Sequence, residues 1–152
     1  MTIMAYRDGV MAADVLLTTG SMQSSCAFPK VIKLPDGGLL GCAGKAADCW
    51  SVQQWFLHGQ PENTPPRLVA AVDSDDAVDF LWVKPDGSVW RSGGHGVWSI
   101  FPCPPFMAIG YRDACIVVDT CFYLGMSAVA AIETAIALHC LLGGPVQAEK
   151  LG

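Results

Sequence analysis

The chain has 152 residues and a mass of 16.1 kDa, a length that fits one domain with a core of its own. Hydrophobic residues make up 52% of it and charged residues only 15%, which is unusually apolar for a monomer, so we expect partner subunits to cover part of its surface. A net charge of −5 without a run of Lys and Arg argues against nucleic acid as a partner.

Neither a membrane span nor a signal peptide is predicted. The longest apolar stretches, Ala114–Val118 and Ala128–Cys140, fall short of the ~20 uninterrupted apolar residues that a span needs. Arg7, Asp8 and Asp14 break up the N-terminal region where a signal peptide would have its apolar segment. We therefore expect the protein to stay in the cytoplasm.

Cysteine is frequent, but its spacing does not favour a metal site. No two of the seven cysteines form a Cys-x-x-Cys pair, and the odd number favours reduced, mostly buried thiols over disulfides or zinc ligands. No metal or cofactor is predicted. The cysteines stand at positions 26, 42, 49, 103, 115, 121 and 140.

Two β-hairpins are predicted in the first third of the chain. Apolar runs at Ile3–Tyr6 and Val10–Ala13 flank a turn that contains Asp8-Gly9, and Asp-Gly between such runs is a strong hairpin signal. The same pattern recurs at Val31–Leu34 and Leu39–Cys42.

A helix is predicted next, over Gly44–Leu57. Cys49, Val52 and Phe56 recur at the spacing of one helix face, so this helix should pack on one side. Three prolines in His58–Arg67 end it and predict a surface connection.

Strands return in the middle of the chain. A third hairpin is predicted from Phe80–Val83 and Ser88–Arg91, followed by a glycine-rich loop at residues 92–96. A further strand is predicted at Val97–Phe101, with pairing ended by Pro102, and a short buried one at Met107–Gly110.

Helices occupy most of the remainder. Two helical segments are predicted before Leu142, separated near Gly125, with Ser127 as the N-cap of the second and Gly143-Gly144-Pro145 ending it. Strands, a helix, more strands and a helix pair make an antiparallel-rich α/β fold of the α+β kind rather than alternating βαβ units. We expect a single domain over residues 1–152, and a four-layer αββα sandwich is compatible with this order.

Several motifs resemble the proteasome β-subunit family and its bacterial HslV-type peptidases. Thr2–Tyr6 followed by Asp8–Asp14 resembles the start of these subunits. Lys30–Leu34 resembles the strand with their catalytic lysine, and Gly41–Asp48 resembles their glycine turn and first helix. Ala108-Ile109-Gly110, with the end of the chain, is similar to a short, phage-associated branch. The resemblance covers nearly the whole chain and implies the four-layer αββα sandwich of an N-terminal-nucleophile (Ntn) hydrolase.

The resemblance also implies a role for each of four residues. Thr2 would be the nucleophile once Met1 is removed, because its own α-amino group, with an ordinary pKa of about 7.7–8.0, would serve as the base. Lys30 would lie beside the Thr2 hydroxyl, and Asp14 would hold the lysine ammonium. The Gly44 amide would donate to the oxyanion of the intermediate.

Each of these residues also has an ordinary interpretation, as a turn or cap for Asp14, a solvated charge for Lys30 and a turn for Gly44. Their joint order favours the catalytic interpretation. One departure weakens it: after Gly110, active family members usually continue with Ser-Gly, whereas this chain has Tyr111-Arg112-Asp113. Tyr111 and the Arg112 cation near the amine would occlude the site or perturb the Thr2 base, unless the Tyr111 hydroxyl replaces the missing donor.

Two functions follow as hypotheses. The first is a proteasome-like threonine peptidase that hydrolyses unfolded polypeptides inside a homo-oligomeric ring, with an unfoldase ATPase as a partner implied by the resemblance alone. The second is a noncatalytic, self-assembling phage structural or scaffold protein with the same fold, located in the virion rather than the cytoplasm.

Overall fold

The computed structural model describes residues 1–19, 22–25, 28–60, 78–92 and 100–152. Three helices lie within these ranges: α1 (Ala46–Leu57), α2 (Arg112–Tyr123) and α3 (Ala128–Leu138). The strands there are β1 (Ile3–Arg7), β2 (Val10–Ala13), β3 (Leu16–Thr19), β4 (Met22–Ser25), β5 (Val31–Lys33), β6 (Leu39–Ala43), β7 (Asp79–Val83), β8 (Val89–Ser92), β9 (Ile100–Cys103), β10 (Met107–Gly110) and β11 (Gln147–Lys150).

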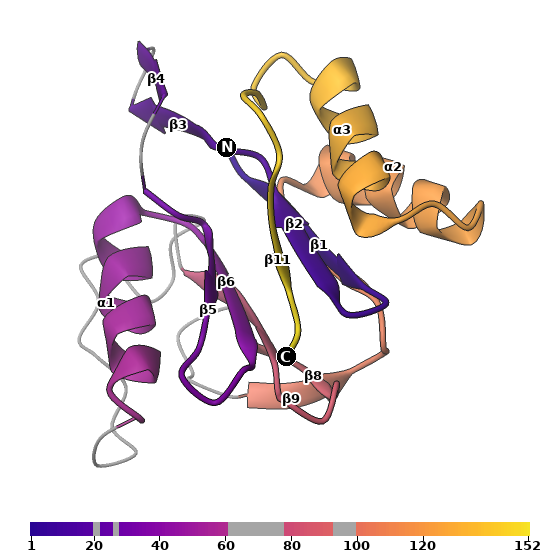
Figure 1. Cartoon of the computed structure of the whole chain (residues 1–152). Helices are drawn as coiled ribbons and strands as arrows, with labels where there is room; N and C mark the ends of the chain where they lie inside the picture. The colour runs from indigo at the N-terminus through magenta and orange to yellow at the C-terminus, as the bar shows by residue number, and fades with distance from the viewer. Residues whose placement is uncertain (20–21, 26–27, 61–77, 93–99) are drawn as a thin grey trace.

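The strands form two antiparallel sheets and one separate hairpin. The first sheet has the order β10-β1-β2-β11, the second has the order β5-β6-β7-β8-β9, and β3 pairs only with β4. α1 covers the outer face of the second sheet, and α2 and α3 cover the outer face of the first (Figure 1). The predicted four-layer αββα sandwich is therefore confirmed.

Side-chain alternation along β1 explains how the layers pack. Ile3 and Ala5 point into a core shared with α2 and α3, whereas Met4 and Tyr6 point into the core between the two sheets. Both cores are fully apolar at this strand, so β1 is buried on its two faces. A third core, which includes Phe56 of α1, lies between the second sheet and that helix.

The two sheets pack tightly against each other at Gly41 of β6. A Cβ atom at this position would lie 2.5 Å from the Met4 sulfur and 2.9 Å from the Met11 sulfur, both in the first sheet. Only glycine leaves room for these two thioethers, which fill the space between the sheets.

The predicted hairpins and helices are confirmed with small shifts at their ends. α1 begins at Ala46 rather than Gly44, and the Ser127 hydroxyl accepts the Ala130 amide as the predicted N-cap of α3. The predicted loop at residues 92–96 begins with the last residue of β8, and its other residues lie outside the described ones, as do residues 97–99 of the strand that was predicted next.

Three features differ from the prediction. β9 continues through Pro102, which pairs with Trp90, because this strand lies at a sheet edge where a missing N–H removes no ladder bond. The hairpin of β3 and β4 was not predicted, nor was β11, whose sequence Gln-Ala-Glu-Lys lacks an apolar pattern. None of the helices in the described ranges is long and apolar enough to cross a bilayer.

Candidate active site

Two hydrogen bonds join the start of β1 to Asp14, the residue that follows β2. The amide of Ile3, the residue after Thr2, donates to Asp14 Oδ1 at 3.0 Å, and the Asp14 amide donates to the Ile3 carbonyl at 3.2 Å. Asp14 is completely buried. The carboxylate is therefore held by the backbone immediately beside Thr2.

Lys30 enters this buried position from the second sheet. Its Nζ donates to Asp14 Oδ1 at 2.9 Å and to the Leu16 carbonyl at 2.7 Å. The exposed fractions of the two side chains are 4% for Lys30 and 0% for Asp14, so water screens the ion pair very little. Asp14 Oδ2 is also buried and has no hydrogen-bond partner among the described residues.

Burial dominates the electrostatics of this lysine. It lowers the pKa of Lys30 below its usual value, although the Asp14 carboxylate acts in the opposite direction. The pKa of the Met1 α-amino group is lowered as well, first by burial and next by the Lys30 charge. The start of the chain and the lysine are thus close enough to interact electrostatically.

Thr2 is fixed from its other side by β10. The Tyr111 amide donates to the Thr2 carbonyl at 2.7 Å, just beyond the pairing of Ile3 with Gly110. Gly110 has a φ of +118°, and a Cβ there would lie 2.1 Å from the Thr2 carbonyl oxygen. Glycine is required at this position, because any side chain would displace Thr2.

Gly44 lies in the turn between β6 and α1, with a φ of +133° and an exposed backbone. Two residues before it, the Cys42 amide donates to the Lys30 carbonyl at 3.0 Å, so this turn belongs to the chain segment beside the lysine. The first amides of α1 point out of the helix start, as in other helices, and are suited to a negative charge.

The structure therefore holds Asp14 and Lys30 as a buried pair, with the half-buried Thr2 next in the chain to the Ile3 amide that binds Asp14. Gly44 lies on the segment that adjoins Lys30. The Tyr111 hydroxyl donates to Asp113 at 3.2 Å, and its ring stacks edge-on against His139 with centroids 5.7 Å apart. In this arrangement the Tyr111 hydroxyl is engaged in the hydrogen bond to Asp113, and the Tyr111 ring packs against the core between the first sheet and the helices α2 and α3.

The nearby thiol is not a competing nucleophile. Cys49, on the first turns of α1, is buried, and burial raises its pKa to about 12, so it stays protonated at neutral pH. Within the described ranges, no group of three or more His, Cys, Asp or Glu side chains is placed to hold a metal ion.

One residue of this region had no signal in the sequence. Gln147 Oε1 accepts the amides of Lys30 at 3.0 Å and Val31 at 3.3 Å, and Gln147 Nε2 donates to the Val31 carbonyl at 2.7 Å. A glutamine in a polar stretch 117 residues from Lys30 carries no local pattern that would reveal this contact.

Comparison with known proteins gives matches to solved structures only, since no family model and no curated protein matches the sequence. The Thiobacillus denitrificans protein BPH, solved in complex with epoxomicin, aligns over 99% of this chain and 98% of its own with a TM-score of 0.68 and 18% identity. The eukaryotic HslV of Trypanosoma brucei aligns over 98% of both chains with a TM-score of 0.68 and 15% identity. This chain has the HslV-type fold.

The coverage shows that the HslV-type fold is present from end to end, with both sheets and all four layers. The fold that the sequence motifs implied is thereby confirmed. At 15% and 18% identity the comparison establishes architecture, and the roles of individual residues depend on the geometry described above.

Proposed function

We propose that this protein is a threonine peptidase with Thr2 as its N-terminal nucleophile after removal of Met1. One observation carries the proposal: a buried Lys30–Asp14 ion pair is tied to the Ile3 amide, one residue from Thr2. Such pairs seldom add stability, because removing both charges from water costs about as much as their attraction returns. Groups with perturbed pKa values collect at functional sites instead.

The proposed reaction starts with proton transfer within one residue. The free α-amino group of Thr2 takes the proton of the Thr2 hydroxyl, directly or through water, as the oxygen attacks the carbonyl carbon of a peptide bond. The tetrahedral intermediate collapses when the leaving amine receives that proton, and an acyl ester on Thr2 remains. Water then hydrolyses the ester by the same base and releases the enzyme.

Lys30 and Gly44 have electrostatic roles in this scheme. The Lys30 ammonium, held by Asp14, favours the neutral form of the nearby amine and stabilises negative charge that develops on the Thr2 oxygen. The Gly44 amide, at the start of α1, donates to the oxyanion, a contact whose loss typically costs about 10²–10³ in rate.

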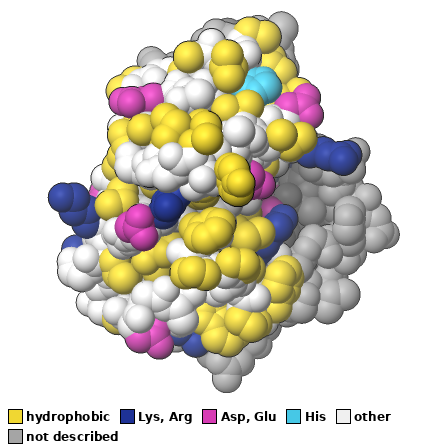
Figure 2. All heavy atoms as spheres, turned by 90° about the vertical axis from the view of Figure 1, so that its right-hand side faces the viewer, with side chains coloured by type: hydrophobic (Ala, Val, Ile, Leu, Met, Phe, Trp, Pro, Cys, Tyr) yellow, Lys and Arg dark blue, Asp and Glu magenta, His cyan; other side chains and the backbone are white. Residues whose placement is uncertain are grey.

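A homo-oligomer fits the surface of the molecule. Tyr123 and Leu124 at the end of α2 are 91% and 70% exposed, and hydrophobic side chains gather over the face formed by α2 and α3 (Figure 2). Apolar groups exposed to this degree favour contacts between subunits. We propose a ring of identical subunits in the cytoplasm that encloses the sites, takes unfolded polypeptides and works with an unfoldase ATPase.

The test uses two substitutions that both permit removal of Met1. Thr2→Ala should abolish hydrolysis of an unfolded, dye-quenched casein, whereas Thr2→Ser should keep part of it because the hydroxyl and amine remain. Intact mass spectrometry checks that Met1 is absent in each. Epoxomicin, the ligand named for the Thiobacillus protein, should inhibit the wild type. Unchanged turnover in Thr2→Ala would rule out this nucleophile.

The engagement of Tyr111 favours a second candidate. Its hydroxyl is bonded to Asp113, so the donor that family members place near the amine has no counterpart in this residue. A noncatalytic protein that uses the same fold to self-assemble, as a phage structural or scaffold component, would have this feature. Assembly without turnover, and without inhibition by epoxomicin, would favour this candidate.

A further inference from the structure

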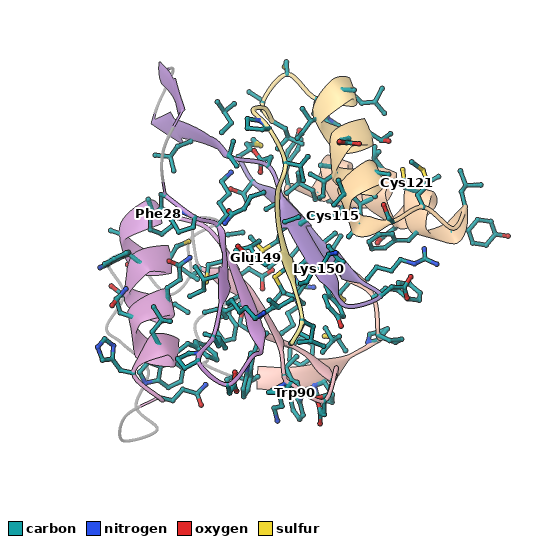
Figure 3. The ribbon with its side chains drawn as sticks, in the orientation of Figure 1. Phe28, Trp90, Cys115, Cys121, Glu149 and Lys150 are labelled. Carbon is teal, nitrogen blue, oxygen red and sulfur yellow. The ribbon has the colours of Figure 1, made fainter. Side chains whose placement is uncertain are left out.

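Gln147 connects the two sheets at the point where the candidate site is built. It is the first residue of β11, at the edge of the first sheet, and its side chain makes three hydrogen bonds to the backbone at the start of β5 in the second sheet. Figure 3 shows β11, with its residues Glu149 and Lys150 labelled, running between β2 of the first sheet and β5 of the second.

The contact is directed at the lysine that the site uses. The Lys30 amide, just before β5 begins, donates to Gln147 Oε1, while the Lys30 carbonyl accepts the Cys42 amide. The Lys30 backbone is thereby held on both sides. In the first sheet Gln147 pairs with Ala13, the residue before Asp14. Gln147 therefore contacts both the strand that leads to Asp14 and the segment that carries Lys30.

The chemistry of the amide side chain suits this task. A glutamine carries an acceptor and a donor in one plane, like a peptide group, and Gln147 uses both against Val31, as a neighbouring strand would. The half-buried Lys30 amide would otherwise lack an acceptor from the sheet, because β5 pairs with β6 only from Val31 onward.

We infer that Gln147 is a positioning residue, which fixes the Lys30 backbone so that the lysine ammonium meets Asp14 beside Thr2. This inference rests on the proposed function for its kinetic consequence. A displacement of about 1 Å in such a site can cost on the order of 10² in rate. The anchor acts on geometry and not on substrate, so its loss should affect kcat rather than KM.

The first arm of the test is kinetic. Gln147→Met keeps the side-chain length but removes all three hydrogen bonds, and kcat should fall about 10- to 100-fold with KM within about two-fold. Gln147→Glu keeps the acceptors and loses the donor, so it should recover part of kcat. Lys150→Met, an exposed change on the same strand, should leave both constants unaltered.

A stability control separates positioning from general damage. Ile132→Val, in the core below α3, lowers the melting temperature without touching the site. If Gln147→Met loses no more kcat than this variant at an equal fraction folded, or if Gln147→Glu recovers nothing, Gln147 is not a positioning residue.

The second arm does not depend on peptidase activity. NMR titration of ¹³C-labelled lysine, with the Lys30 signal assigned by its loss in Lys30→Arg, should show the Lys30 pKa moving toward its usual value in Gln147→Met, because a released side chain is better hydrated. An unchanged Lys30 titration would overturn the inference. If the wild type has no activity but the titration moves, the proposed function fails while the anchor stands.

Discussion

Two cations lie at opposite ends of β1, and they are bound in different ways. At the end of the strand, Arg7 Nη1 donates to the carbonyls of Phe122 at 2.6 Å and Met126 at 3.3 Å, where α2 ends. Its guanidinium lies over the rings of Phe106 and Phe122, 5.8 Å and 5.4 Å from their centroids. Beside the start of the strand, Lys30 is paired with the buried carboxylate of Asp14.

The difference separates a structural cation from a candidate catalytic one. Arg7 donates to two backbone carbonyls and lies over aromatic faces, and its carboxylate partner, Asp8 at 3.3 Å, is 87% exposed to water. Arg7 itself remains 23% exposed and ties the β1–β2 hairpin to the helix pair. Lys30 is nearly inaccessible to solvent, has a lowered pKa and lies close to the start of the chain. The packing of the two sheets against each other does not require a charge at this position. Substitution of Lys30 should therefore abolish activity, substitution of Arg7 should leave activity unchanged, and both substitutions should destabilise the fold.

Replacing Lys30 should have the largest effect. Lys30→Met leaves the Asp14 carboxylate buried and unpaired, so we expect loss of measurable peptide hydrolysis and a decrease of about 3–5 kcal/mol in the free energy of unfolding. Urea denaturation and a peptidase assay measure the two. Adding Asp14→Leu should restore much of the stability but no activity, and activity in the double variant would exclude Lys30 from the mechanism.

Replacing Arg7 should affect stability alone. Arg7→Met removes three charge-assisted hydrogen bonds, one of them to an exposed carboxylate, and the contact with the rings, which predicts a loss of about 1–3 kcal/mol in the free energy of unfolding. The value of kcat/KM of the folded protein should stay within two-fold of the wild type. A ten-fold loss of kcat/KM would show that the two ends of β1 are coupled and would break the distinction between them.

The pH dependence of hydrolysis should reflect the Lys30 end only. The base must be neutral, so kcat/KM should rise with pH through the pKa of the freed Thr2 amine, which we expect the nearby Lys30 charge to lower, as it lowers the pKa of the Met1 amine. It should fall again as Lys30 loses its proton, at a pH below the usual lysine pKa of 10.5. Both limbs should persist in Arg7→Met. A profile without an alkaline limb up to pH 10.5 would contradict a role for the lysine charge.

The smallest effect is expected at the helix pair itself. Ser127→Ala removes the N-cap of α3 and should lower the free energy of unfolding by about 1 kcal/mol without changing kcat/KM. Glu133→Gln, an exposed change on the same helix, is a matched control. If Ser127→Ala altered turnover, the packing of α3 would have to influence the geometry of the candidate site.

The sequence predicted the parts of this fold that depend on local chemistry. Asp8 and Gly9 both have positive φ in the first turn, so the Asp-Gly signal identified the hairpin correctly. β11 escaped prediction because its stability comes from pairing with β2, from Gln147 with Ala13 to Lys150 with Val10, far away in the sequence, and not from an apolar pattern of its own. Edge strands with polar sequences are recognisable only once their neighbours are known.

The candidate site was predicted by resemblance and could not have been assembled from spacing. Asp14 and Lys30 meet beside the start of β1 because a hairpin and two sheets bring them together, and no local rule joins a lysine to an aspartate 16 residues away. Gln147 was invisible for the same reason. For Tyr111 the sequence showed that the residue departs from the family pattern, but it did not show that the Tyr111 hydroxyl donates to Asp113.

The most direct measurement compares the chain with and without the residue before Thr2. A fusion to a carrier that a processing protease removes immediately before Thr2 yields the free threonine amine, and a second fusion cleaved before Met1 yields the blocked form, each verified by intact mass. We expect casein hydrolysis from the first product and none from the second. Equal hydrolysis by both would show that the threonine amine is not the base, and the peptidase mechanism proposed for this protein would be wrong.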